Sequence, residues 1–261
     1  MGTNYIAPMW RMPKNTNKDK LSNYNIEFDS GDWMELEATA DPLPIFTPQD
    51  KKFSVSMWVK PDDATPAAAE YLYYIMSAGG AGKIGFWLDT TGKINWRVYT
   101  VGGVKTITST ATLSDNTWYH IVGTWDGSTI NLYIDGASAA TPVAATDAYA
   151  ATSGNTWATF GVYRYGSTGA SKGGYFTGEA GPLAIWNNIA LGESQIQYLY
   201  NLNNPMVPGD VNLPTPIAYY PLGDNSNPNT TAGYPNISVG ADSVFDFSGT
   251  NPNQIEIPAS T

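Results

Sequence analysis

The chain has no cysteine and a single histidine among its 261 residues, and these scarcities exclude several kinds of site. Without cysteine there is no disulfide framework, no thiolate nucleophile and no cysteine-based zinc centre. The one histidine, His120, stands without a Gly-x-Ser-x-Gly nucleophile motif anywhere in the sequence, so a serine hydrolase is not supported. The redox compartment stays open, because a chain without cysteine functions in either one.

Charge is also scarce, and positive charge most of all. Charged residues make up 14% of the chain, with 13 Lys and Arg against 23 Asp and Glu, a formal net charge of −10. No cluster of Lys or Arg offers a surface that follows phosphates, so we expect no nucleic-acid partner. No apolar run reaches the length of a membrane span, and the first residues lack the basic and apolar regions of a signal peptide. We therefore expect no membrane insertion and no self-encoded export signal.

What the chain does have is apolar, aromatic and turn-forming residues. Hydrophobic residues make up 42% of the chain, with nine Trp, 26 Gly and 18 Pro. This is enough apolar material for a substantial core, and the turn formers suit many short strands. The composition argues against a helical bundle.

Residues 118–136 predict a complete β-hairpin. Two alternating runs, 118–125 and 129–135, flank the turn pair Asp126-Gly127, and Asp135-Gly136 closes the unit. Asp-Gly tolerates the positive φ angles of tight hairpin turns. Period-two alternation places one set of side chains on a single face, namely Ile130, Leu132 and Ile134.

Similar alternation predicts strands elsewhere, with one helix near the end of the domain. The helix is expected over 193–200, where Ile196, Leu199 and Tyr200 form one apolar stripe. Residues 164–177 are rich in Gly, Ser and Tyr and predict an exposed loop. The fold class is all-β: an antiparallel two-sheet jelly-roll sandwich with one short C-terminal-side helix. The further strands are expected at 25–28, 33–37, 53–60, 71–77, 84–88, 94–98, 105–108, 157–163 and 182–186.

Four segments describe the domain organisation: an arm at 1–23, a domain at 24–202, a linker at 203–216 and a strand-forming tail at 217–261. The arm is either a loose terminus or a docking segment, since a Trp beside two Met is costly to leave in water. The tail at 243–257 echoes the start of the domain like a half-repeat, either by chance or as the opening of a second copy. We expect it to pack on its own domain or on a neighbour. The residues expected to serve assembly are Met9, Trp10, Met12, Tyr219, Phe245 and Phe247.

The motifs resemble those of the laminin-G-like (concanavalin A-like lectin/glucanase) superfamily. The resemblance rests on residues 53–61, the hairpin at 118–136, residues 178–186 and residues 191–201, in the expected order. It implies a jelly-roll sandwich and says less about function, because this fold hosts lectins, glycosidases, adhesion modules and virion proteins. His120 matches a histidine that the family commonly carries, which we interpret as a hydrogen-bonded core residue.

The resemblance bears on catalysis and on metal binding. Glucanases of the superfamily carry paired carboxylates on one strand, as glycoside hydrolysis requires. Only Glu35 and Glu37 approach that pattern, in the wrong strand, so no catalytic residue is assigned and we expect no enzyme activity. Relatives also hold one calcium ion near the first strand turn, which implies either no cofactor or one structural Ca²⁺ on Asp29, Asp32 and Glu179.

Two functions remain open. Exposed aromatic rings among neutral polar groups suit sugars, and the candidate glycan-binding residues are Tyr149, Tyr163, Tyr165 and Tyr175. The openings at 20–31 and 217–225 resemble those of phage virion proteins, including marine ones. This favours a non-enzymatic virion protein (decoration, fibre or tail-associated) whose partners are copies of itself, other virion proteins and host-surface glycans. The alternative is a secreted or cell-surface carbohydrate-binding or adhesion module, and a glycosidase or polysaccharide lyase comes last.

Overall fold

The computed structural model describes residues 26–29, 31–39, 52–77, 82–150, 156–165, 171–201, 212–220 and 238–239. Within these ranges the secondary structure is almost entirely β, with one helix, α1 (Glu193–Asn201). The strands are β1 (Ile26–Phe28), β2 (Met34–Thr39), β3 (Phe53–Pro61), β4 (Glu70–Ser77), β5 (Gly82–Leu88), β6 (Ile94–Thr100), β7 (Gly103–Thr108), β8 (Tyr119–Trp125), β9 (Thr129–Ile134), β10 (Ala137–Ser138), β11 (Val143–Ala144), β12 (Thr156–Phe160), β13 (Tyr163–Tyr165), β14 (Ser171–Gly173), β15 (Gly178–Asn187), β16 (Ala218–Tyr220) and β17 (Ser238–Val239).

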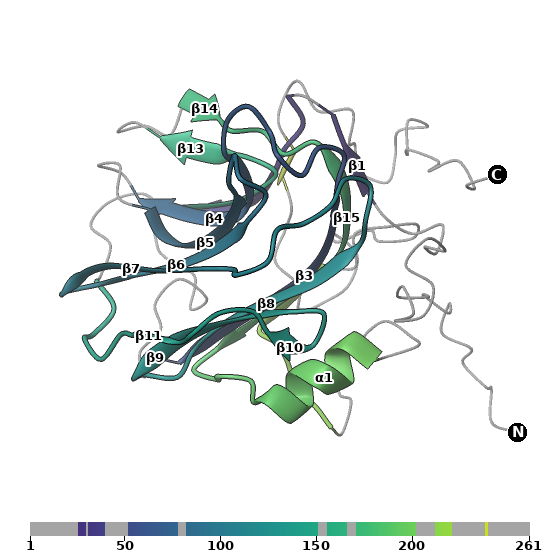
Figure 1. The fold of residues 1–261 in the computed structure, drawn as a ribbon. Coiled ribbons are helices and arrows are strands. Elements are labelled where there is room, and N and C mark those ends of the chain that lie inside the picture. Colours follow the sequence, from purple (N-terminus) through teal and green to yellow (C-terminus); the bar gives the residue numbers. More distant parts are fainter. Residues whose placement is uncertain are drawn as a thin grey trace, which may run out of the picture.

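Two antiparallel sheets pack face to face (Figure 1). The eight-stranded sheet has the order β1-β15-β3-β8-β9-β10, with β11 beside β9 and β16 beside β15. The seven-stranded sheet has the order β17-β2-β12-β4-β5-β6-β7, and β13 and β14 pair separately. This confirms the predicted all-β sandwich with one short helix.

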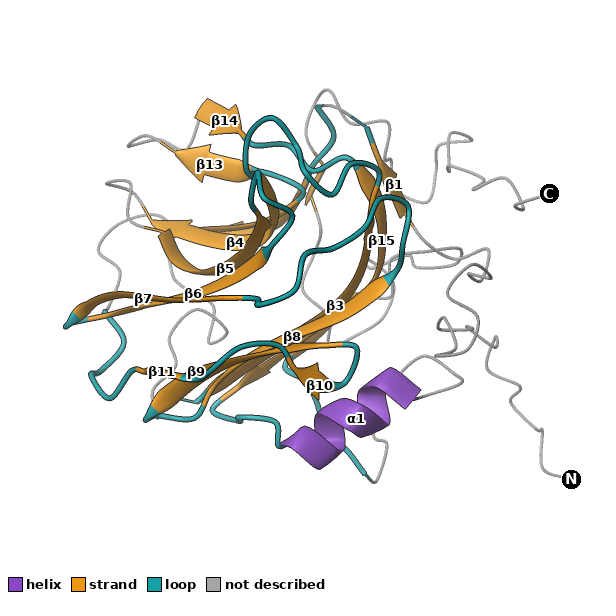
Figure 2. Ribbon diagram, viewed as in Figure 1, coloured by secondary structure: helices purple, strands orange, loops and turns teal. Residues whose placement is uncertain are grey.

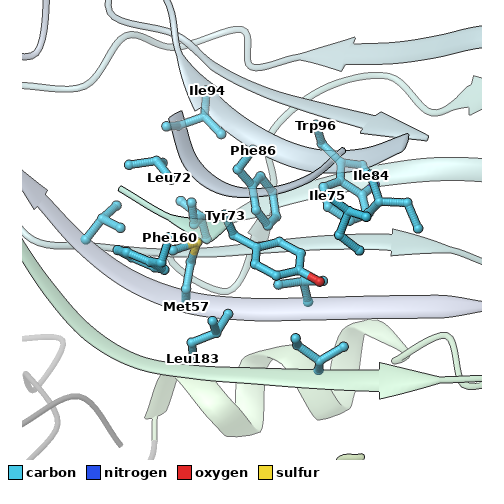
Figure 3. Packing of buried hydrophobic residues seen from close by; sticks show 14 of the residues in the cluster. Met57, Leu72, Tyr73, Ile75, Ile84, Phe86, Ile94, Trp96, Phe160 and Leu183 are labelled. Carbon is cyan, nitrogen blue, oxygen red and sulfur yellow. The ribbon is translucent and has the colours of Figure 1, made fainter. Parts of the chain in front are cut away.

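Alternation along the strands fills the space between the sheets. Met57 and Leu183 from one sheet meet Tyr73, Ile75 and Phe86 from the other, all almost completely buried (Figure 3). Burying one such side chain contributes about 1.5–3 kcal/mol, so this layer is the main source of stability. The predicted hairpin is present as β8 and β9, and its side chains at 130 and 132 are fully buried.

The second packed layer lies between α1 and the outer face of the eight-stranded sheet (Figure 2). The helix starts after Gly192, whose backbone N–H donates to the side chain of Gln195 at 3.0 Å. Under the helix lies His120, 1% exposed, with its Nε2 hydrogen-bonded to Ser56 Oγ at 2.8 Å. The predicted helix and the core histidine are both confirmed.

Two segments differ from the sequence prediction. Residues 164–177, predicted as an exposed loop, contain β14 and the fully buried Phe176, because Gly-rich composition does not exclude a short hairpin. Within the predicted linker, residues 212–216 pack on the domain. Leu213 is buried there, and Trp186 Nε1 donates to the carbonyl of Pro214 at 2.7 Å.

The C-terminal segment contributes one strand to each sheet. In β16, Tyr219 lies opposite Ala184 of β15, and β17 pairs with β2 at Met34 and Glu35. The arm at 1–23, residues 203–211 of the linker and the assembly candidates Met9, Trp10, Met12, Phe245 and Phe247 lie outside the described residues. Among the residues that are described, no helix has the length and apolarity needed to cross a membrane.

Candidate functional site

A cluster of aromatic side chains covers part of the seven-stranded sheet on the face that points away from the core. Alternation sends Tyr73 and Ile75 of β4 inward, and Tyr74 and Met76 outward. The same rule turns Trp87 of β5 outward, between two core residues. Strands β13 and β14 lie over this face, on the opposite side of β4 and β5 from β3 and β8 (Figure 1).

Four of these rings form a stacked row, which we call the aromatic row: Trp87, Tyr71, Tyr163 and Tyr165. The ring centroids of Trp87 and Tyr71 are 6.3 Å apart with planes at 27°, and those of Tyr71 and Tyr163 are 4.8 Å apart at 25°. Tyr163 and Tyr165 continue the row at 5.4 Å and 19°. Because the inner rings cover one another, the free end of the row is Tyr165, whose side chain is 41% exposed.

A close backbone contact holds β13 and β14 against the sheet. Tyr71 N donates to the carbonyl of Gly174 at 2.9 Å. Gly174 has a φ of +62°, and a Cβ at this position would stand 2.6 Å from both the carbonyl of Ala69 and the ring of Tyr71. Only glycine permits this approach without strain. The contact therefore positions Tyr163 on top of Tyr71.

The floor beside the row is built around Tyr74 and Arg97. A Cβ on Gly85 would stand 2.3 Å from the Tyr74 ring, so the absence of a side chain there lets the ring lie across β5. Arg97 Nη1 donates to the Tyr74 hydroxyl at 2.8 Å. Burial raises the pKa of Tyr74 to about 12, although Arg97 opposes the shift, so the hydroxyl stays protonated at neutral pH.

Cations lie on three tryptophan rings of this region. The guanidinium of Arg97 is 4.8 Å from the centroid of Trp87. Arg164 of β13 lies over Trp33 and Trp157, and Lys172 of β14 lies 4.6 Å from the Trp33 ring. Arg164 and Lys172 are also direct cross-strand partners, a like-charge arrangement that the shared ring offsets through cation–π attraction.

The predicted glycan-binding tyrosines do not all meet. Tyr163 and Tyr165 are neighbours in the aromatic row, as described above, whereas Tyr175 is half-buried in the segment after β14. Tyr149 is a correction: it is only 9% exposed and belongs to the core cluster, so its ring is not a surface for a ligand. The sequence misled because an Ala- and Thr-rich segment looks solvated, while residues 148 and 150 bond the tip of the β6–β7 hairpin.

Two of the three predicted calcium ligands, Asp32 and Glu179, are engaged with protein groups. Asp32 is buried and accepts a hydrogen bond from the backbone N–H of Asp29 at 3.0 Å. Glu179 forms an ion pair with Lys60 and lies opposite Glu27 of β1. No group of three or more His, Asp or Glu side chains within the described ranges is arranged to hold a metal ion. The described residues thus do not bring Asp29, Asp32 and Glu179 together as such a group, and the calcium site stays a prediction.

Sequence reasoning missed Tyr71, Tyr74, Trp87 and Arg97. A signal for them existed, since Trp87 and Arg97 each sit between two inward-facing core residues, and alternation assigns both to the outer face. That these outward positions come together under β13 depends on the sheet order. Glu35 and Glu37 lie in β2, where their backbones pair with Thr159 and Ala158 of β12.

Fold and surface together define the class as an antiparallel β-sandwich of the lectin type with an aromatic outer face. The chain belongs to the concanavalin A-like lectin/glucanases superfamily, whose family model matches residues 28–197, more than half of the chain. No curated protein matches the sequence.

Solved structures share the fold at low sequence identity. The heptameric SAP-like pentraxin from Limulus polyphemus aligns with a TM-score of 0.53 and 14% identity over 85% of this chain and 97% of its own. A putative carbohydrate-binding protein from Bacteroides ovatus ATCC 8483 aligns with a TM-score of 0.55 and 14% identity. The alignment covers 79% of this chain and 54% of the other, so this chain spans about half the length of that protein. The CBM40 of Ruminococcus gnavus IT-sialidase, bound to α2,3-sialyllactose, aligns with a TM-score of 0.50 and 11% identity. The alignment covers 68% of this chain and 96% of the CBM40.

Proposed function

We propose that this protein is a carbohydrate-binding or adhesion domain whose ligand contacts the aromatic row on the seven-stranded sheet. The observation that carries the proposal is the exposed ring of Tyr165 at the end of a row of stacked rings. The superfamily supports it, and so do two solved structures of the same fold, the putative carbohydrate-binding protein and the CBM40 bound to α2,3-sialyllactose. The carbohydrate-binding or adhesion module, which was the alternative from the sequence, is thus the main function that we propose.

The row prepares Tyr165 for stacking against a sugar. The C–H face of a pyranose packs against an aromatic ring while its hydroxyls bond nearby polar groups. Tyr165 is backed by Tyr163, which is backed in turn by Tyr71, so its ring is already ordered before a ligand arrives. An ordered ring loses less conformational entropy on binding, which favours affinity.

Replacing Tyr165 by alanine should weaken glycan binding at least about tenfold, because the stacking surface is lost. The measurement is affinity electrophoresis and a glycan array with neutral and acidic saccharides, with melting curves to establish folding. Tyr133→Ala is the matched control, since Tyr133 is a half-buried tyrosine on the outer side of the opposite sheet. Unchanged binding by the Tyr165 variant would remove the aromatic row from consideration.

Binding without hydrolysis is part of the proposal. Glycoside hydrolysis needs two carboxyl groups flanking one bond, whereas the side chains described around the row are aromatic and cationic. We expect no reducing ends when the protein is incubated with glucans, agarose or alginate. Product release that disappears in Glu35→Gln would overturn this expectation.

A second candidate is a structural role in a phage virion, in contact with copies of itself and other virion proteins. Its support is the resemblance of residues 20–31 and 217–225 to the openings of phage virion proteins, while β16 and β17 add part of the C-terminal segment to the two sheets of the same chain. Mass spectrometry of purified particles should then detect the chain in stoichiometric amounts. Its absence from purified particles, with secretion or display on a cell surface instead, would leave the adhesion role alone.

A further inference from the structure

Arg97 is an unusual residue for the outer face of an acidic protein. It is half-buried on β6, in a chain with only 13 basic residues and a net charge of −10. Its guanidinium rests on the last ring of the aromatic row, 4.8 Å from the centroid of Trp87. The position thus joins a planar cation to the surface proposed above for sugars.

No carboxylate of the described residues pairs with the charge of Arg97. The ion pairs of the described residues are Lys60–Glu179 and Lys105–Asp147, and neither involves Arg97. One guanidinium nitrogen donates to the neutral hydroxyl of Tyr74, and the buried Nε has no hydrogen-bond partner. A buried donor without a partner is unfavourable, so the fold itself does not satisfy the full hydrogen-bonding capacity of this guanidinium.

The two cross-strand neighbours of Arg97 bring no carboxylate to its guanidinium. Its cross-strand partners are Gly85 on β5 and Thr106 on β7, which carry no charge. At the other end of the row, Arg164 and Lys172 add two positive charges around Trp33. Three basic residues therefore lie around the aromatic rings of this face.

We propose that this face binds acidic oligosaccharides, with Arg97 receiving a carboxylate or sulfate group of the ligand. A guanidinium suits both anions, because the N–H groups that Tyr74 does not engage can donate charge-assisted hydrogen bonds to their oxygens. Arg97 and Tyr165 stand at opposite ends of the row with Tyr71 and Tyr163 stacked between them, so a ligand that touches both is a chain of sugars. This inference rests on the proposed function and names its ligand class.

The test compares three sets of soluble oligosaccharides by isothermal titration calorimetry: neutral glucans, polyuronates and sulfated galactans. Wild-type protein should bind the polyuronates, the sulfated galactans or both more tightly than the neutral set, with affinity falling as salt rises. Arg97→Gln should lose about 10- to 100-fold in affinity for the acidic set, the loss of one charge-assisted pair, along with most of the salt dependence. Arg97→Lys should keep part of the affinity for acidic saccharides and part of the salt dependence, because lysine retains a point charge.

Two controls keep the result specific. Lys52→Gln removes one exposed positive charge before β3 and should leave binding unchanged. Melting curves of the Arg97 variants separate lost binding from lost support of Tyr74, and binding is compared at a temperature where each variant is folded.

The outcomes distinguish this inference from the function beneath it. Tighter binding of neutral than of acidic saccharides, or acidic binding unaffected in Arg97→Gln, overturns the acidic class. The carbohydrate-binding function would still stand in that case if Tyr165→Ala abolished binding. Failure of the wild type to bind any of the three sets overturns both.

Discussion

Replacing Gly123 by alanine should lower the free energy of unfolding by about 3 kcal/mol, at the upper end of overpacking effects. Gly123 lies in β8, and a Cβ there would stand 2.3 Å from Cδ2 and 2.6 Å from Cε2 of Trp96. The Trp96 ring is completely buried and packs against Phe86 at 4.5 Å, so it has no room to withdraw. The melting temperature should fall by roughly 10 °C in calorimetry.

Two comparisons test the cause. Gly173→Ala is the matched control, because its Cβ would meet only the Tyr165 ring at an ordinary 3.7 Å. Trp96→Leu removes the obstructing ring, so Gly123→Ala combined with Trp96→Leu should be less destabilised than the two single changes added together. Strict additivity would show that the clash with Trp96 is not the cause.

The second large effect is acid destabilisation through His120. Complete burial lowers the pKa of His120 from 6.5 to about 3, so the folded protein keeps the ring neutral. The pKa is depressed in the folded state, so the unfolded state takes up a proton first as the pH falls. Stability contributed by this group is complete above pH 6.5 and is lost on acidification toward pH 3, on the order of 5 kcal/mol.

Glu70 opposes the effect of His120 on the pH dependence of stability, and this makes the prediction specific. Burial raises the pKa of Glu70 from 4.5 to about 7, so its contribution is complete at low pH and is lost as the pH rises from 4.5 to 7. The two contributions partly cancel between pH 4.5 and 6.5 in the wild type. Denaturant titrations should show that Glu70→Gln steepens the loss on acidification in this window.

The variant His120→Gln should change the pH dependence of stability in the opposite direction to Glu70→Gln. His120→Gln retains a partner for Ser56 Oγ and removes the titrating ring, so acidification from pH 7 to 4.5 should stabilise it relative to the wild type. Because His120 is the single histidine of the chain, no other imidazole contributes to the difference. An equal pH slope in wild type and His120→Gln would contradict the assignment.

Much of the fold was predictable because its signals are local. The alternation in β3, β8 and β9 is set by the pleat of each strand, and Asp135 and Gly136 both adopt the positive φ angles that their residue types tolerate. The same holds for α1, predicted at 193–200 and observed at 193–201. Each of these features depends on a few neighbouring residues.

The site was only half predictable. Tyr163 and Tyr165 stood out as tyrosines in a polar segment, yet the partners that order them come from β4 and β5, far away in sequence. Tyr149 was placed at the surface because its neighbours are polar, while a bridge to Thr100 draws it into the core. Both outcomes depend on which strands become neighbours.

The sequence by itself determined most of the long strands, the tight turns of the hairpin at 118–136, the core face of those strands and the class of sandwich. These follow from period-two alternation and from turn chemistry, which act over a few residues. Only the tertiary structure decided that Trp87, Tyr71, Tyr163 and Tyr165 form one row with Arg97 at its end. The reason is physical: alternation says which side chains face outward, whereas strand order and close contacts such as Gly174 on Ala69 decide which of them meet.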